Sequence, residues 1–393
     1  MTAAALRLPR RADFAVPAAA AVGRPALNLW TFGAPYLAAT IYFFVMIKDD
    51  SRIFAPVLPF AVVAVVALGA TIVERRLPWL NMPVLLMVLV YAGVCLVSIA
   101  LSQNNDSFAL RKIGLPLVGM APAIFRFYVT PRQLLAFIVA LAWVAFTYTT
   151  QTSDMVGDGF FSTDSPNESI LGVAFGALTV WLAASRRPLL AALCYGLCIF
   201  FFKRNAIAAA LIVSALVVAF ELFAPHHEAK LLARLSLAAL ALMATLAFFL
   251  SDIFDLAASH LLRGYNSEFL SVGRTPIYDA IVDNFARSTL GEQIWGHGAG
   301  AVEHLIANQR SVNPALQLAH NEYLSWLYDF GIAGLIVLLG AFSRLARDGA
   351  SAAALLLFVA LSMSGENFFL VSFNCLAVFV LFSTRIIDPR ARA

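Results

Sequence analysis

Charged residues are scarce in this chain of 393 residues. Only 13% of them are Asp, Glu, Lys or Arg, whereas 61% are hydrophobic. A soluble domain has about 25% charged and about 45–50% apolar residues. The composition therefore excludes a soluble enzyme, a disordered protein and a nucleic-acid-binding module, and it is typical of a protein that crosses a membrane several times.

Cysteine is also rare. The four cysteines, Cys95, Cys194, Cys198 and Cys375, all lie inside apolar runs. Cys194 and Cys198 are one helical turn apart, where the geometry for a disulfide is poor. We interpret the four thiols as small core side chains without a redox or metal-binding role.

Long apolar runs fill most of the chain. A membrane-spanning helix needs about 20 apolar residues to cross the bilayer core. We expect helices because no other open backbone form pairs its own N–H and C=O groups in lipid. The pattern predicts an all-α, polytopic membrane protein with about twelve transmembrane helices. The expected spans are Trp30–Ile47, Ile53–Val73, Leu80–Leu101, Ile113–Tyr128, Gln133–Thr150, Ile170–Ala184, Leu189–Phe202, Ala206–Phe223, Leu235–Leu250, Tyr323–Phe342, Ser351–Ser364 and Phe368–Ser383.

Basic residues collect at every second connection, which by the positive-inside rule places both termini in the cytoplasm. The predicted organisation follows from this side assignment. It is a cytoplasmic tail (1–29), nine transmembrane helices (30–250), a large periplasmic loop (251–322), three further helices (323–384) and a cytoplasmic tail (385–393).

The loop between the ninth and tenth expected spans is long enough to contain helices of its own. Ser251–Leu262 is amphipathic, and Thr275-Pro276 predicts a helix start with Thr275 as the N-cap. The glycine-rich run at 296–300 then precedes a helix that ends at about Asn308. We expect this loop to be the functional lid.

Cations on the predicted outer face are candidate binding residues. The segment before Lys203-Arg204 rises only about 21 Å, less than the roughly 30 Å of the hydrocarbon core. We therefore expect Arg204 below the outer headgroups, where a cation needs a polar cavity or a bound anion; the alternative is that it snorkels to lipid phosphates. Glu366 follows an equally short segment and is expected at a similar depth, unless it only forms a turn before the next helix.

Arg274 directly precedes the helix start at Thr275-Pro276. A guanidinium beside free backbone N–H groups at a helix N-terminus suits a phosphate or a pyrophosphate. Arg263 and Arg310 are weaker candidates for the same role. Arg287 is expected to form an ion pair with Asp283, four residues earlier on the same helix. We interpret this pair as exposed to solvent.

His320 begins the run His320-Asn321-Glu322-Tyr323-Leu324, where the loop returns to the membrane. An imidazole can accept a proton at neutral pH, so His320 is a candidate base, with a helix-capping or surface histidine as the alternative. The other loop histidines, His260, His297 and His304, lack the paired spacing of a zinc-binding helix. The sequence therefore predicts no metal site.

These segments resemble the family of O-antigen ligases and O-antigen polymerases, integral membrane glycosyltransferases of the GT-C type with about twelve helices and one large periplasmic loop. The resemblance covers about Phe202–Leu339. Lys203 departs from the serine that is common in the family. The matching segments are Lys203-Arg204-Asn205-Ala206, Gly273-Arg274 through Asp279, Gly296-His297-Gly298-Ala299-Gly300, His320-Asn321-Glu322-Tyr323-Leu324, and Asp329-Phe330-Gly331-Ile332-Ala333-Gly334-Leu335.

The resemblance implies that a glycan is transferred from undecaprenyl pyrophosphate to an acceptor sugar hydroxyl, with inversion and without a metal or other cofactor, at the periplasmic face of a bacterial inner membrane. It implies that Arg204 and Arg274 hold the leaving pyrophosphate and that His320 positions or deprotonates the acceptor. The residues it implies for substrate binding are Lys203, Arg263, Asn321, Glu322, Tyr323 and Glu366.

Three alternatives stay open. A ligase uses the lipid A core as acceptor and a polymerase uses another lipid-linked repeat; we slightly favour the ligase. A transporter is the non-enzyme alternative, although the chain shows no internal repeat and few charges inside spans other than Glu221 and Asp329. A metal-dependent lipid-linked glycosyltransferase would use Asp49 and Asp50 in the first outer loop, which is too short for the usual architecture of that class.

Overall fold

The computed structural model describes residues 27–28, 80–102, 107–153, 171–201, 203–261, 274–308, 319–365 and 372–386. Within these ranges the chain is mostly helical, as its composition predicts. The α-helices are α4 (Met82–Leu101), α5 (Ser107–Met120), α6 (Pro131–Ser153), α7 (Leu171–Ala184), α8 (Pro188–Phe200), α9 (Arg204–Phe223), α10 (Glu228–Ala247), α11 (Leu250–Leu256), α13 (Thr275–Arg287), α14 (Leu290–Trp295), α15 (Ala301–Asn308), α16 (Glu322–Leu345), α17 (Ala350–Ser362) and α18 (Ser372–Ser383). The shorter elements are η2 (Ala121–Ile124), the π-helical turn η3 (Ala257–Leu261), η4 (Ala346–Asp348), and the strands β1 (Leu27–Asn28), β2 (Phe127–Val129) and β3 (Thr384–Ile386).

Four helical stretches in the described part are long and apolar enough to cross a membrane: Met82–Leu101, Arg204–Phe223, Glu228–His260 and Glu322–Asp348. Shorter apolar helices pack beside them, among them α7, α8 and α17. The first two expected spans lie outside the described residues, so the total of twelve stays a prediction. From Leu80 onward the apolar helices of the described part fall on the expected spans, with one correction.

The correction concerns the expected span Ile113–Tyr128. The helix there, α5, begins earlier and ends at Met120, and a 3-10 turn and strand β2 follow it. The turn contains Pro122, which cannot donate a helical hydrogen bond and so disfavours continuation of α5, although the helix accommodates Pro116 in its interior. Strand β2 pairs in parallel with β1 and β3, so a small three-stranded sheet interrupts the otherwise helical architecture that the sequence predicts.

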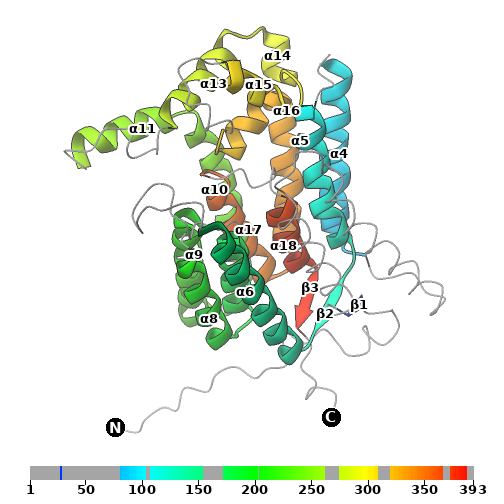
Figure 1. Ribbon diagram of the computed structural model, residues 1–393, viewed down its shortest axis with the longest axis vertical. Helices are drawn as coiled ribbons and strands as arrows, with labels where there is room; N and C mark the ends of the chain where they lie inside the picture. Colours follow the sequence, from blue (N-terminus) through cyan, green and yellow to red (C-terminus); the bar gives the residue numbers. More distant parts are fainter. Residues whose placement is uncertain are drawn as a thin grey trace, which may run out of the picture.

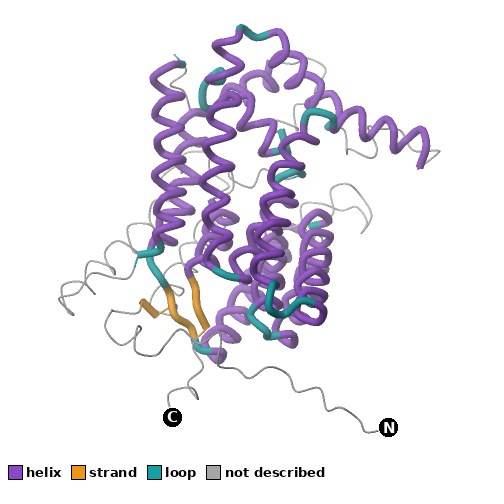
Figure 2. The backbone as a smooth tube through the Cα atoms, turned by 180° about the vertical axis from the view of Figure 1, so that it is seen from behind, coloured by secondary structure: helices purple, strands orange, loops and turns teal. Residues whose placement is uncertain are grey.

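The bundle has two distinct ends (Figure 1). Helices α13, α14 and α15 cover one end, which we call the loop end, and the three strands lie at the other, which we call the strand end; Figure 2 shows the same arrangement from behind. At the strand end Asp348 contacts Arg126 at 2.6 Å and Arg385 at 3.3 Å. The sequence predicts both arginines to be cytoplasmic and the loop helices to be periplasmic.

The helices of the loop end follow local sequence signals closely. Helix α13 begins at Thr275 with Pro276 in its first turn, but its N-cap is Arg274, so the expected capping role of Thr275 is wrong. Helix α14 was not expected, although Thr289 and Glu292 form a capping box, for which the spacing is a recognised signature. Arg287 pairs with Asp283 at 3.7 Å on the exposed face of α13, as the sequence indicates.

The glycine-rich run packs against a break in α16. At Gly331 the backbone leaves the helical conformation, with φ 68°, so nearby carbonyl groups lose their partners within the helix. Amides of the run replace them: the N–H of His297 donates to Tyr328 O and that of Gly298 donates to Asp329 O, both at 3.0 Å. A Cβ atom on Gly331 would overlap the opposite backbone, so glycine is required there.

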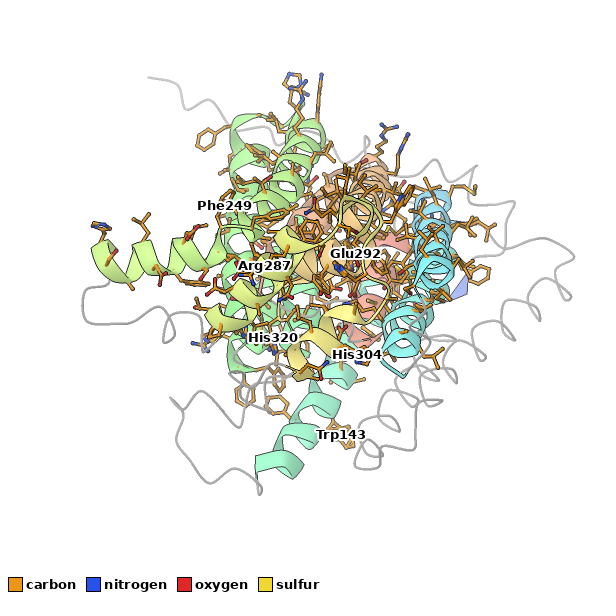
Figure 3. The ribbon with its side chains drawn as sticks, turned by 90° about the horizontal axis from the view of Figure 1, so that it is seen from above. Trp143, Phe249, Arg287, Glu292, His304 and His320 are labelled. Atoms are coloured by element: carbon orange, nitrogen blue, oxygen red, sulfur yellow. The ribbon has the colours of Figure 1, made fainter. Side chains whose placement is uncertain are left out.

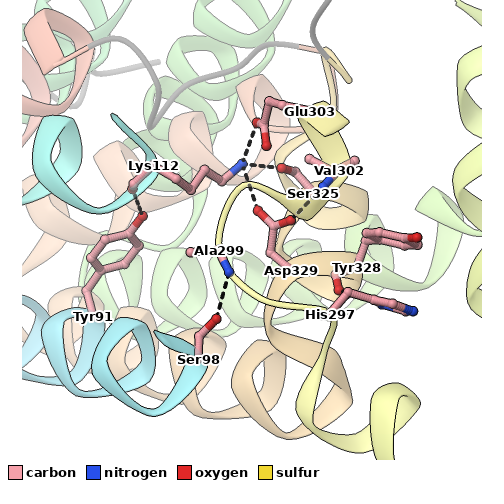
Figure 4. A network of polar contacts seen from close by, with 10 residues as sticks. All are labelled: Tyr91, Ser98, Lys112, His297, Ala299, Val302, Glu303, Ser325, Tyr328 and Asp329. Carbon is pink, nitrogen blue, oxygen red and sulfur yellow. Dashed lines mark hydrogen bonds and ion pairs between the residues drawn. The ribbon is translucent and has the colours of Figure 1, made fainter. Parts of the chain in front are cut away.

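A buried ionic cluster holds the same region together (Figure 4). The Lys112 ammonium on α5 lies 3.3 Å from Glu303 on α15 and 3.4 Å from Asp329 on α16, and it also contacts the Ser325 hydroxyl. None of the three charged side chains is more than 3% exposed. Asp329 also accepts the backbone N–H of Val302 at 2.9 Å. The cluster therefore fastens the loop helix α15 and the membrane helix α16 to α5.

Replacing Lys112 with Met is expected to cost about 3–5 kcal/mol, because two buried carboxylates lose their counterion. Unfolding of the purified protein in mixed micelles measures the loss. Lys230→Met is the matched control, since Lys230 is exposed on α10 and its loss should cost less than about 0.5 kcal/mol.

A charge-free variant separates charge from packing. Adding Glu303→Gln and Asp329→Asn to Lys112→Met should restore much of the stability, because the remaining groups are neutral. An unchanged unfolding midpoint in Lys112→Met alone would contradict the structural role of the cluster.

Candidate active site

Two short helices end close to one another near the loop end. Helices α8 and α17 each have 13 residues and therefore rise only about 20 Å. The turn after α8 leads through Lys203 into α9, and the turn after α17 contains residues 363–365. The side chain of Asn205 in the first turn of α9 donates to the carbonyl of Gly365 at 3.1 Å. The ends of both short helices are thus joined by a hydrogen bond, and the expected depth of Arg204 below the outer headgroups stays a prediction.

The turn after α17 also binds the start of α16. The backbone N–H of Glu322 donates to Met363 O at 2.9 Å, and the amide of Asn321 donates to Ser364 O at 3.1 Å. The side-chain oxygen of Asn321 in turn accepts the N–H of Leu324 at 3.0 Å, so Asn321 is the N-cap of α16. These bonds position the segment that begins with His320.

Arg274 reaches the same turn from the loop helices. Its guanidinium donates to Gly365 O at 3.1 Å, the acceptor that Asn205 also uses. Residues 363–365 therefore accept hydrogen bonds from three segments that are far apart in the sequence. These segments are the starts of α9, α13 and α16. Each of these segments belongs to one of the family-like motifs found in the sequence.

Cations occupy the N-terminal ends of two of these helices. Lys203 is the N-cap of α9, Arg204 is its first residue, and Arg274 is the N-cap of α13. A helix N-terminus carries a partial positive charge and favours an anion, and the cationic side chains add to that positive charge. Neither α9 nor α13 has an acidic residue in its first turn. The arrangement suits a ligand with several negative charges.

His320 lies directly before the N-cap of α16, with a left-handed φ of 48° that is uncommon for a non-glycine residue. The histidine is therefore not the helix cap, which is Asn321. Burial and the positive charges of Arg274 and Lys203 lower the pKa of His320 from 6.5 to about 3. At neutral pH the imidazole is uncharged and able to accept a proton. Figure 3 looks onto the loop end and labels His320 there.

The remaining predicted site residues fall into three groups. Arg204 is exposed at the start of α9, between two residues that take part in the site. Arg263 and Glu366 lie outside the described residues. Glu322 and Tyr323 are buried, and the Tyr323 hydroxyl donates to Ala360 O on α17 at 2.9 Å. With Asn321, these two residues fasten α16 to α17, a structural task that the sequence does not indicate.

Three residues of this region were missed by sequence reasoning. Lys112 was not singled out, because it lies one residue before the expected span at Ile113; in the structure it is a buried residue of α5, which begins at Ser107. Asn205 was noted in a motif but not as a contact, and Gly365 was not singled out. No local signal reveals a contact between residues 160 positions apart.

The other histidines of the loop end do not gather into a metal site. Within the described residues no group of three histidines, cysteines or carboxylates could hold a metal ion. His297 instead stacks on Tyr328, with ring centroids 4.1 Å apart, and contacts the Ser288 hydroxyl at 2.8 Å. The four cysteines are buried, as expected of core side chains.

Residues 171–339 match the family model described as O-Antigen ligase. A comparison with curated proteins gives no match. The matched region contains the starts of α9, α13 and α16, the glycine-rich run and the break at Gly331. It favours an enzyme over the transporter considered from the sequence. Residues 171–339 thus form an O-antigen ligase domain, and this match supports the resemblance of the chain to the family of O-antigen ligases and polymerases.

Proposed function

We propose that the chain transfers a glycan from undecaprenyl pyrophosphate to an acceptor sugar hydroxyl at the periplasmic face of the bacterial inner membrane, as an O-antigen ligase. The observation that supports this proposal is the meeting of two cation-bearing helix starts with His320 at the turn after α17. A pyrophosphate carries several negative charges, which suits helix N-termini that bear cations.

In the proposed reaction the acceptor oxygen attacks C1 of the donor sugar from the face opposite the pyrophosphate. The new C1–O bond forms as the bond to the pyrophosphate oxygen breaks, so the configuration at C1 inverts. The bonding electron pair leaves with the pyrophosphate, whose charge Arg204 and Arg274 stabilise, with Lys203 beside them. His320 accepts the hydroxyl proton and then releases it to solvent.

Arg274→Ala is expected to lower turnover by about a hundredfold to a thousandfold, because a donor to the leaving group is lost. Arg274→Lys should recover activity only in part, since an ammonium replaces a planar fork with a point charge. Turnover of a lipid-linked donor by purified protein measures both. Arg287→Ala is the matched control, because Arg287 lies on the same helix and is 82% exposed.

The same assay is run in excess chelator. Full turnover is expected there, because the arginines meet the charge of the leaving group. Activity that disappears and returns with magnesium or manganese would favour the metal-dependent class and the pair Asp49 and Asp50. Near-wild-type turnover of Arg274→Ala would remove Arg274 from the proposal.

The pH dependence tests the role of His320. Its lowered pKa keeps the imidazole neutral, and protonation disables it only as the pH falls toward about 3. The acidic limb of kcat/KM is therefore expected well below pH 6.5. Bound pyrophosphate offsets the charges of Arg274 and Lys203, so the limb in kcat should lie at a higher pH than the limb in kcat/KM.

Variants of Lys203 test the cause of the lowered pKa of His320 in this pH profile. Lys203→Ser removes one of the charges that lower the pKa of His320 and should move the limb toward 6.5, whereas Lys203→Arg should leave it in place. His320→Asn, which can hydrogen-bond but not accept the proton, should lose about a hundredfold to ten-thousandfold in turnover. Substantial activity in His320→Asn would make the histidine an orienting group only.

The acceptor is tested in a strain that lacks the gene. For a ligase, long glycan chains are expected to remain on the lipid carrier, and lipopolysaccharide should carry only its core. For a polymerase, single repeats would reach the lipopolysaccharide, and long chains would be missing altogether. Profiles of lipopolysaccharide and of lipid-linked glycans from the same cells separate the two outcomes.

A further inference from the structure

The carbonyl oxygen of Gly365 accepts two side-chain hydrogen bonds, from Asn205 and from Arg274, each at 3.1 Å. A carbonyl oxygen has two lone pairs, so these two donors use its full capacity. The oxygen lies just past the C-terminal end of α17, where the helix carries partial negative charge that favours a guanidinium. One backbone atom thus joins the turn of the Lys203-Arg204-Asn205 motif to the arginine of the loop.

The bond from Arg274 restricts its guanidinium. Five N–H groups of an arginine lie in one plane, so the direction of one bond sets the directions of the others. The direction of the Gly365 carbonyl therefore helps to set where the other N–H groups of the Arg274 plane point. The side-chain amide of Asn205 donates to the second lone pair of that carbonyl oxygen and so restricts its direction. No direct contact between Asn205 and Arg274 is needed for this effect.

Gly365 has to be a glycine for the arrangement to form. A Cβ atom at this position would overlap the side-chain nitrogen of Asn205. The exposed position of Asn205 gives a second argument. Removing an exposed hydrogen-bonding group leaves no buried atom unsatisfied, so the contact contributes little to folding, and its geometric effect on Arg274 is what remains.

We propose that Asn205 is a positioning residue, which acts through the carbonyl of Gly365 to orient Arg274 toward the leaving pyrophosphate. This inference rests on the proposed function, because it assigns Arg274 to the leaving group. Asn205 itself does not touch the reacting atoms in this proposal.

The test compares kcat at saturating undecaprenyl-pyrophosphate-linked donor for full-length protein in lipid nanodiscs. Asn205→Ala and the near-isosteric Asn205→Asp both remove the N–H donor, and each should lower kcat roughly tenfold or more, because a misplaced group loses much of its catalytic effect. Asn284→Ala is the matched control: Asn284 also donates its amide to a backbone carbonyl, at 2.8 Å, but within α13. Its kcat should stay within about twofold of wild type.

A double-mutant comparison shows whether Asn205 acts through Arg274. In an Arg274→Lys background, which lacks the planar fork, Asn205→Ala should change kcat by less than about twofold. Gly365→Ala should reproduce the loss of Asn205→Ala, and the combination should be no worse than either change alone. Equal losses in both backgrounds would instead mean that Asn205 acts independently of Arg274 and would overturn the proposal.

Two further outcomes separate this inference from the proposed function. If Arg274→Ala is inactive while Asn205→Ala and Asn205→Asp keep the wild-type kcat, only the positioning role is refuted. If Arg274→Ala keeps full turnover, the proposed role of Arg274 fails first. Thermal unfolding accompanies each assay, and a drop in Tm that accounts for the lost activity of Asn205→Ala would identify a structural role and refute positioning.

Discussion

The carbonyl groups of the turn after α17, residues 363–365, set the constraint on which the candidate site depends. Carbonyl groups that are not paired within a helix need donors from elsewhere. Here the donors come from the backbone of Glu322, the amides of Asn321 and Asn205, and the guanidinium of Arg274. These hydrogen bonds bring three helix starts together at one turn. The same contacts give the cationic groups their common location.

A second set of contacts keeps α16 in place below this turn. The break at Gly331 exposes carbonyl groups that the glycine-rich run satisfies, and Lys112 neutralises charge where α15 and α16 meet. Polar backbone and buried charge are both costly in an apolar bundle, so each has to be matched by a specific partner. This matching explains why the glycine-rich run and the Asp329 segment, 30 residues apart in the chain, behave as one unit.

Much of the fold follows from the sequence, and the reasons for the exceptions are physical. Apolar runs locate the helices after Leu80 because length and hydropathy suffice for that purpose. They do not locate the end of α5, where Pro122 and the pairing of β2 override the apolar pattern. Among the site residues, Arg274 and His320 stand out because charge is rare near membranes. Lys112 and Asn205 do not, because their partners lie far away in the chain and only folding brings them together.

The electrostatics of the site couple donor binding to the proposed base. Burial of the imidazole, together with the positive charges of Arg274 and Lys203, holds the pKa of His320 low, so the imidazole is neutral but a weak base. A pyrophosphate that pairs with these cations removes part of that effect and makes the imidazole a stronger proton acceptor. The base of the proposed reaction therefore gains strength when the leaving group is in place. Removal of the acceptor proton is then most favourable when the donor is bound. Without the donor, the enzyme is less able to activate an acceptor hydroxyl.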